Sequence, residues 1–192
     1  EYLETLNRET ERLVSLIEDL LTISRIDAGT AVPQPAILDL NALAAGLVGD
    51  RRKLFAERAL ELTLAPGQEL PPVRADERML VQVIANLMTN AMNYTPAGGT
   101  VSISTSREAF EGRLWATLTI TDTGFGIGDD EKPRVFERFY RGEASRSTGT
   151  PGTGLGLSIC KEILARHGGR IEFESEAGMG SSCRSWIPAA AP

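Results

Sequence analysis

Two side-chain amides four residues apart are the first candidates for chemistry in this sequence. Asn86 and Asn90 fall within residues 76–93, where apolar residues recur with helical spacing. Residues four apart share one face of a helix, so the two amides would lie together. Amide oxygens suit a hard cation such as Mg²⁺, which usually joins one or two protein oxygens to substrate phosphates. Taken alone, the pair is explained better by ordinary capping or by surface amides.

A carboxylate followed by closely spaced glycines forms the second candidate. The segment DTGFGIG begins at Asp122, directly after a strand predicted over 114–121. A carboxylate at a strand end can accept a hydrogen bond from the exocyclic amine of a base. Gly124 and Gly126 would let the backbone turn sharply and approach that ligand. The pattern indicates a base-binding turn, with a solvated aspartate in an ordinary turn as the alternative.

The third candidate is the glycine-rich segment GTGLGL, which begins at Gly152 and opens a helix predicted over 155–166. Free backbone N–H groups and the positive end of the helix would face any anion bound there. The segment lacks the GxxxxGK[ST] pattern and does not follow a strand, which disfavours a nucleoside-triphosphatase loop and a dinucleotide fingerprint. We interpret it as a phosphate site, with a glycine-rich hinge as the alternative.

Aromatic and basic residues alternate in FERFYR, which lies between these two glycine-rich segments. We expect Phe136 and Phe139 to be core residues. Arg141 borders the following polar loop and is better placed to reach a phosphate, because a guanidinium matches phosphate oxygens in a fork. Arg146, within that loop, is a weaker candidate.

The other reactive side chains are expected to be structural. His167, the only histidine, precedes a Gly-Gly pair, and interaction with a helix C-terminus explains it without catalysis. Cys160 and Cys183 are too few for a disulfide framework, so we expect buried free thiols in a reducing compartment. Trp115 and Trp186 are expected to pack on strands.

The composition is that of a globular protein and argues against a membrane-spanning protein and against a nucleic-acid-binding protein. The 192 residues are 42% hydrophobic and 24% charged, which is typical of soluble globular proteins. No apolar run approaches the roughly 20 residues that a membrane-spanning helix needs. A net charge of −6 argues against a nucleic-acid partner held by broad phosphate neutralisation. Because the chain begins at Glu1, we expect a piece of a longer protein.

Hydrophobic periodicity and helix breakers predict the elements that hold these residues. Apolar residues over 2–27 predict an amphipathic helix packed in a bundle, with a single helix lying on the domain as the alternative. Gly29 and two nearby prolines place a linker over 30–38, before a main domain over 39–192. Further helices are predicted over 41–58 with Asn41 as its cap, 76–93 with Asp76 as its cap, 134–141 and 155–166. Strands are predicted over 37–40, 60–64, 101–106, 114–121, 170–176 and 181–187, and a mobile loop over 142–153.

The order of the motifs NLMTNAMNYTP, DTGFGI, FERFYR and GTGLGL resembles the ATP-binding domain of sensor histidine kinases. ISRIDAG resembles the end of the second dimerisation helix, which would assign residues 1–29 to that helix. HGGRIEFESEAGMGSS resembles the last two strands of the domain, so the likeness covers nearly the whole chain. The resemblance implies an α+β fold shared with gyrase, Hsp90 and MutL. That fold is a two-layer α/β sandwich with a mixed, mostly antiparallel sheet.

The same resemblance implies a site for ATP and Mg²⁺. Asp122 would bind the adenine amine and Tyr94 would pack near the ring. Asn90, assisted by Asn86, would coordinate Mg²⁺, and Arg141 would neutralise phosphate charge. The remaining residues implied to contact the nucleotide, under a lid over 142–153, are Gly124, Gly126, Ile127, Gly152, Thr153, Gly154, Leu155, Gly156 and Leu157.

The implied activity is that of a histidine protein kinase, which passes the ATP γ-phosphoryl to a histidine and then to a response regulator receiver domain. The parent would be a homodimer through its dimerisation helices, with this chain as a cytoplasmic domain, and could be anchored in the bacterial inner membrane.

No histidine precedes His167, so the phosphoacceptor lies outside this chain. Asn93 stands where the family usually carries Lys or Arg. Asn86 stands where ATP-hydrolysing sister families carry a water-activating glutamate, which favours transfer to a protein. A non-catalytic nucleotide-binding module of the same fold is the alternative.

Overall fold

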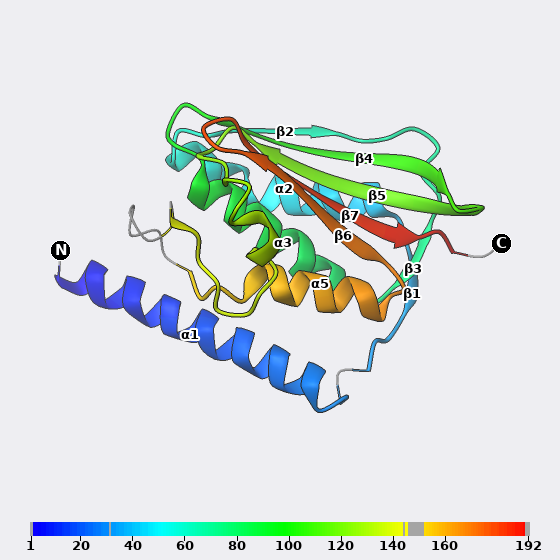
Figure 1. Cartoon of the computed structure of the whole chain (residues 1–192), viewed down its shortest axis with the longest axis horizontal. Helices are drawn as coiled ribbons and strands as arrows, with labels where there is room; N and C mark the ends of the chain where they lie inside the picture. The colour runs from blue at the N-terminus through cyan, green and yellow to red at the C-terminus, as the bar shows by residue number, and fades with distance from the viewer. Residues whose placement is uncertain (1, 31, 144, 146–151, 191–192) are drawn as a thin grey trace.

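A mixed sheet covered on one face by helices forms the body of the molecule (Figure 1). The computed structural model describes residues 2–30, 32–143, 145 and 152–190. The strands of this sheet are β2 (Glu61–Ala65), β4 (Thr100–Phe110), β5 (Arg113–Asp122), β6 (Arg170–Glu176) and β7 (Gly180–Pro188). They lie in the order β2-β4-β5-β7-β6, with β2 parallel to β4 and all other neighbours antiparallel.

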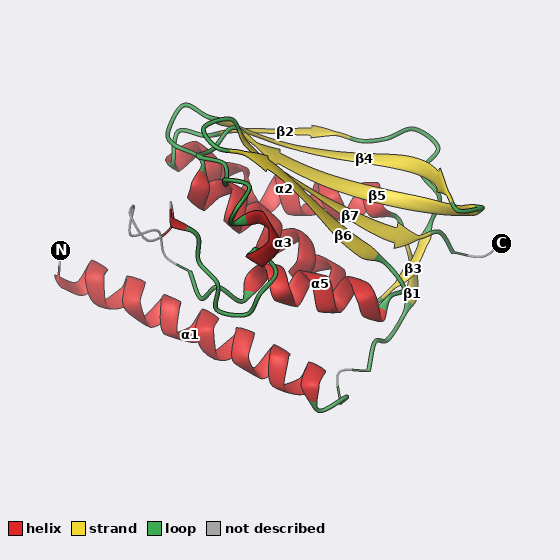
Figure 2. Ribbon diagram, viewed as in Figure 1, coloured by secondary structure: helices red, strands yellow, loops and turns green. Residues whose placement is uncertain are grey.

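Helices cover one face of this sheet (Figure 2). They are α2 (Leu40–Glu57), α3 (Glu77–Tyr94) and α5 (Gly156–Arg166). A separate antiparallel pair consists of β1 (Ala36–Leu38) and β3 (Val73–Ala75), and the long helix α1 (Tyr2–Asp27) runs along α5. The predicted two-layer sandwich with a mixed, mostly antiparallel sheet after a long helix is confirmed. The short strand β3 was not predicted, because three residues are too few to reveal an alternating pattern.

The core lies between the sheet and the helices. Ile103 pairs with Ile120 across β4 and β5, and Ile120 pairs with Cys183 on β7. All three are buried, together with Leu87 of α3 and Ile159 of α5. Alternating strand residues and one face of each helix therefore meet in a single apolar layer.

Asp39, rather than Asn41, caps α2. The Asn41 N–H donates to Oδ1 of Asp39 at 2.8 Å, while the Asn41 side chain donates to the Gly67 carbonyl at 3.0 Å. The strand predicted over 37–40 therefore ends earlier, at Leu38, because Asp39 is the residue that satisfies the first helical N–H groups.

The helix predicted over 134–141 is wrong. A short 3₁₀ helix, η1 (Lys132–Arg134), is followed by turns. Phe139 has a φ of +63°, and its N–H donates to the Gly154 carbonyl at 2.9 Å instead of to a carbonyl of its own helix. The side chain of Phe139 is 64% exposed, so its predicted place in the core is also wrong.

The other aromatic residues pack largely as predicted. Phe136 is half-buried and lies edge-on to Phe173, with 6.5 Å between ring centroids. Trp115 on β5 and Trp186 on β7 are buried against each other at 6.1 Å. The prediction that the two tryptophans are packing residues on strands is confirmed.

His167 joins the end of α5 to the start of α3. Its Nε2 accepts the N–H of Asp76 at 3.0 Å, so the ring proton is on Nδ1, which donates to the Ile163 carbonyl at 2.8 Å. This contact is the predicted interaction with a helix C-terminus. Cys160 and Cys183 are buried and free, also as predicted.

Helix α1 contacts the rest of the molecule near its C-terminal end. Ile23 and Ile26 are buried, and the Ile26 carbonyl accepts Nη2 of Arg166 at 2.6 Å. Large apolar side chains elsewhere on α1 are exposed, namely Leu13, Val14, Ile17, Leu20 and Leu21. No helix in the described ranges combines the length and apolar character needed to cross a membrane.

Candidate functional site

One face of α3 links the two glycine-rich segments. Asn86, Asn90 and Tyr94 recur every four residues and therefore share this face. At one end, Nδ2 of Asn86 approaches the Gly156 carbonyl at 3.4 Å, where α5 begins. At the other end, the Tyr94 carbonyl accepts the N–H of Phe125 at 3.1 Å. Asn90 thus lies between the Asp122 turn and the start of α5.

The Asp122 turn depends on its glycines. The Gly124 N–H donates to Oδ1 of Asp122 at 2.8 Å, and a Cβ at Gly124 would come within 2.6 Å of that oxygen. Gly126 has a φ of +64°, and a Cβ there would overlap the Glu176 carbonyl. Only residues without a side chain fit these two positions, because the space that a Cβ would need is filled by the backbones of Tyr94 and Glu176.

The carboxylate of Asp122 is largely removed from water. Burial raises its pKa above 3.8, while hydrogen bonds from the N–H groups of Gly124 and Ser181 act in the opposite direction. The group is therefore a desolvated acceptor held in a fixed direction. Such an acceptor suits a neutral N–H donor on a ligand, because the low local dielectric strengthens the hydrogen bond.

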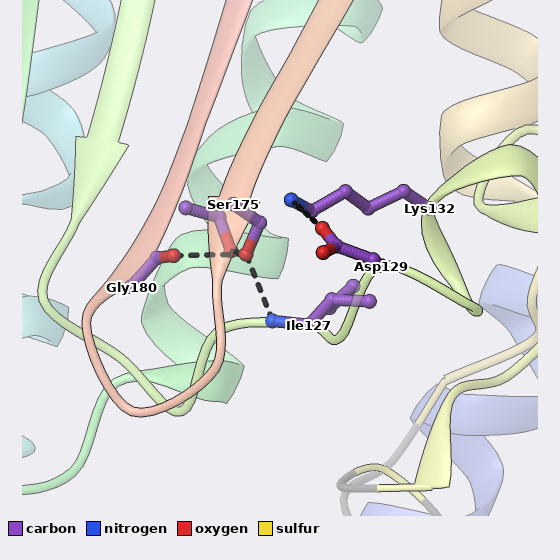
Figure 3. A network of polar contacts seen from close by, with 6 residues as sticks. Ile127, Asp129, Lys132, Ser175 and Gly180 are labelled. Carbon is purple, nitrogen blue, oxygen red and sulfur yellow. Dashed lines mark hydrogen bonds and ion pairs between the residues drawn. The ribbon is translucent and has the colours of Figure 1, made fainter.

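Ser175 fixes the end of this turn (Figure 3). Its hydroxyl accepts the Ile127 N–H at 2.8 Å and donates to the Gly180 carbonyl at 2.8 Å. Nearby, Lys132 and Asp129 form an exposed ion pair at 2.6 Å. Sequence reasoning missed Ser175, because its position beside the turn follows only from the pairing of β6 with β7.

The GTGLGL segment is fixed mainly by its backbone. Gly154 has a φ of +74°, and a Cβ there would come within 2.7 Å of the Phe139 backbone. The Leu155 side chain is fully buried, and its N–H donates to Oγ1 of Thr153 at 3.1 Å. Leu157 is half-buried against the same core. These leucines position the segment, and the glycines leave its backbone accessible.

Helix α1 reaches this segment, which the sequence did not predict. Thr153 donates its hydroxyl to Oδ2 of Asp19 at 2.8 Å, and burial raises the pKa of Asp19. Arg138 forms two hydrogen bonds of 2.7 Å with the carboxylate of Asp27. Two carboxylates of α1 therefore contact the motifs on either side of residues 142–151.

Arg141 lies at the start of the predicted lid. Its Nε and Nη2 donate to Oγ of Ser145 at 3.0 and 2.9 Å. Glu131 binds the same region through Oε1, which accepts the Tyr140 hydroxyl at 2.9 Å and the Glu143 N–H at 2.8 Å. Arg146 and most of the predicted lid lie outside the described residues.

Two buried thiols, Cys160 and Cys183, lie close to residues of the site. Burial, together with the negative charge of Asp122, raises the pKa of Cys183 to about 12. Burial also raises the pKa of Cys160, as does its neighbour Cys183, while a hydrogen bond with Asn86 opposes the shift. Both thiols are therefore uncharged at neutral pH.

The Asn90 side chain suits a ligand or metal. It has no hydrogen-bond partner among the described residues, although it is half-buried. In the same part of the chain, no three His, Cys, Asp or Glu side chains converge to hold a metal. The donor set on this face is thus amide oxygen, which matches Mg²⁺ bound jointly by protein and phosphate.

Comparisons with known proteins agree with this arrangement. Residues 75–191 match the family described as histidine kinase-, DNA gyrase B-, and HSP90-like ATPase. The chain is 38% identical over 189 residues to sensor histidine kinase RppB of Synechocystis sp., covering 97% of this chain and 40% of RppB. It is 36% identical over 187 residues to sensor-like histidine kinase SenX3 of Mycolicibacterium smegmatis, covering 97% of this chain and 47% of SenX3.

A solved structure extends the likeness to three dimensions. Full-length ShkA in complex with AMPPNP matches with a TM-score of 0.81 and 28% identity, over 99% of this chain and 39% of ShkA. The chain spans less than half the length of each of these three proteins. The family match covers the elements that carry Asp122, Asn90 and the GTGLGL segment. The chain therefore belongs to the histidine kinase-, DNA gyrase B- and HSP90-like ATPase family, as an ATP-binding catalytic domain of the sensor histidine kinase type.

Proposed function

We propose that the parent of this chain transfers the γ-phosphoryl group of ATP to a histidine outside the chain, for relay to a receiver-domain aspartate of a response regulator. The observation that carries this proposal is the amide face of α3, which connects the Asp122 turn to the start of α5. ATP lying along this face would place adenine at Asp122 and its phosphates at the GTGLGL segment.

Asp122 would recognise the adenine base of ATP. Its carboxylate would accept the exocyclic amine of adenine, and Gly124 and Gly126 would shape the turn that presents this carboxylate. Tyr94 and Ile127 flank the turn and would line the adenine pocket. A base without an amine at this position would leave the desolvated Asp122 unsatisfied, which costs binding free energy.

Asn90, assisted by Asn86, would hold Mg²⁺ through an amide oxygen, and Mg²⁺ would supply charge neutralisation at the phosphates. Phosphoryl transfer through a loose transition state depends mainly on positioning and on neutralising charge. The backbone of Gly152, Gly154 and Gly156 would position the phosphates. Thr153 and Arg141 would add polar and cationic contacts after releasing their present partners.

Asn86 supports transfer to a protein rather than to water. It is an amide one helical turn before Asn90, where no carboxylate is present to activate a water molecule. The exposed apolar side chains of α1 support a second part of the proposal, namely that the parent dimerises by burying this helix in a bundle.

Phosphorylation in trans tests the proposal. The chain would be mixed with the acceptor-histidine helix of its parent, ATP and Mg²⁺, and we expect acid-labile phosphohistidine on that helix. Asp122→Asn and Asn90→Ala should each reduce its formation. Tight ATP binding without phosphohistidine would favour the non-catalytic nucleotide-binding module. Sustained phosphate release by the chain alone would instead indicate ATP hydrolysis.

A further inference from the structure

A guanidinium from α2 lies on the amide face of α3. Asn93 follows Asn90 by three residues and Asn86 by seven, so it shares their side of the helix. Its Oδ1 accepts Nη1 of Arg58 at 2.9 Å. The side chain at position 93 is therefore an uncharged amide, but the guanidinium of Arg58 places a positive charge beside it.

The backbone of Arg58 is fixed at the end of α2. Arg58 is the C-cap residue, and its N–H donates to the Phe55 carbonyl at 3.1 Å. Ala59 follows in the left-handed region with a φ of +54°, and its carbonyl accepts the Gly98 N–H at 2.8 Å. Gly98 belongs to the loop that directly follows Tyr94, so the backbone of Arg58 is anchored at the Tyr94 end of α3. Its guanidinium reaches back to Asn93, less than one helical turn from the proposed Mg²⁺ ligand Asn90.

The charge of Arg58 is available to a ligand. Within the part of the chain that the structure describes, Arg58 forms no ion pair, and Asn93 uses only one of its five N–H donors. A neutral amide orients the guanidinium without cancelling its charge. By contrast, Arg51 donates to Thr89, about 100° around the helix from Asn90, and Arg141 is bound by Ser145.

We propose that Arg58 is a nucleotide-binding residue whose guanidinium, held by Asn93, contacts the phosphates of ATP bound along α3. It supplies the positive charge that asparagine at position 93 lacks. A polyanion needs such a local cation on a chain whose net charge is −6. The inference rests on the proposed function, because it adds a contact to the same ATP site.

Calorimetric titration with ATP and Mg²⁺, and separately with adenosine, tests this role. Arg58→Ala should weaken ATP binding about tenfold, as expected for one lost charge-assisted contact at a partly solvated site. The affinity for adenosine, which has no phosphate, should stay unchanged. Arg52→Ala is the matched control, because Arg52 is exposed on the same helix and its loss changes the net charge equally. We expect Arg52→Ala to leave ATP affinity within about twofold of the wild type.

A second variant separates lost charge from a damaged fold. Adding Asn93→Lys to Arg58→Ala restores a cation on this face and should recover most of the ATP affinity. Wild-type ATP affinity in Arg58→Ala, a parallel loss of adenosine affinity, or no recovery in the double variant would each overturn the role of Arg58. If the wild-type chain itself bound no ATP, the proposed function would fail instead.

Discussion

Asp122 shows how a single side chain can favour binding at the expense of stability. Its folded pKa lies above 3.8 because burial disfavours the carboxylate. Hydrogen bonds from the N–H groups of Gly124 and Ser181 compensate for only part of the lost hydration. A charged group kept in this state is useful only if a ligand completes its hydrogen bonds.

Replacing Asp122 with Asn should therefore separate affinity from stability. Asparagine keeps the oxygen that accepts the Gly124 N–H but presents an amide where the adenine amine needs an acceptor. We expect ATP affinity to fall about ten- to a hundredfold, since hydrogen bonds to charged groups contribute roughly 1.5 to 3 kcal/mol. Titration calorimetry measures this change, and an unchanged Kd would exclude Asp122 from the adenine contact.

Raising the pH should increase the stability of Asp122→Asn relative to that of the wild type. Because the folded pKa of Asp122 is raised, its contribution to stability is present below pH 3.8 and is lost as pH rises through the folded pKa. The asparagine of the variant does not titrate, so the difference in unfolding free energy should shift toward the variant between about pH 4 and pH 7. Urea unfolding at both pH values measures the shift, and the opposite sign would contradict the raised pKa.

Helix α1 meets the catalytic domain through ionic contacts that can be weakened separately from the core. The hydrogen bond from Arg138 lowers the pKa of Asp27, so this pair contributes above pH 3.8 and is lost as pH falls through the folded pKa. Asp27→Asn should loosen the last turns of α1. We expect faster hydrogen exchange at Ile23 and Ile26, with exchange in α3 unchanged.

A matched control is Glu57→Gln, which breaks the exposed pair between Lys53 and Glu57 on α2. It should leave hydrogen exchange in α1 unchanged. Equal exchange rates at Ile23 in Asp27→Asn and in the wild type would mean that apolar burial alone holds α1 in place.

Features that depend on residues close together in the sequence were predicted, whereas contacts between residues far apart in the sequence were not. Most helices and strands were predicted, because their apolar periodicity is local, and Asp76 caps α3 as expected. The helix over 134–141 failed because Phe139 bonds Gly154, fifteen residues ahead in the sequence. Asn86, Asn90, Asp122 and the glycines of the candidate site were named from their types and spacing. The place of Tyr94 and the assignment of these residues to one ATP site came from the family resemblance. The contacts made by Ser175, Asp19 and Arg58 were not, since each depends on elements that meet only after folding.

In the whole molecule, the two buried thiols provide a probe of how often the core opens. Cys160 on α5 and Cys183 on β7 lie in the buried core between the sheet and the helices. With a pKa of about 12, Cys183 is protonated at neutral pH, and Cys160 is fully buried. A thiol reagent should therefore react only after the layer between sheet and helices opens.

Thiol labelling should consequently report ATP binding at a distance from the nucleotide. We expect native Cys160 and Cys183 to react orders of magnitude more slowly than in guanidinium chloride, where both are accessible. ATP with Mg²⁺ at about 100 times its Kd stabilises the folded state by about 2.7 kcal/mol, which should slow labelling roughly a hundredfold if opening is global. Asp122→Asn should lose most of this protection at the same ATP concentration. Rapid labelling of the native chain, or labelling that ignores ATP while calorimetry detects binding, would show that the thiols open by a local motion that does not involve the site.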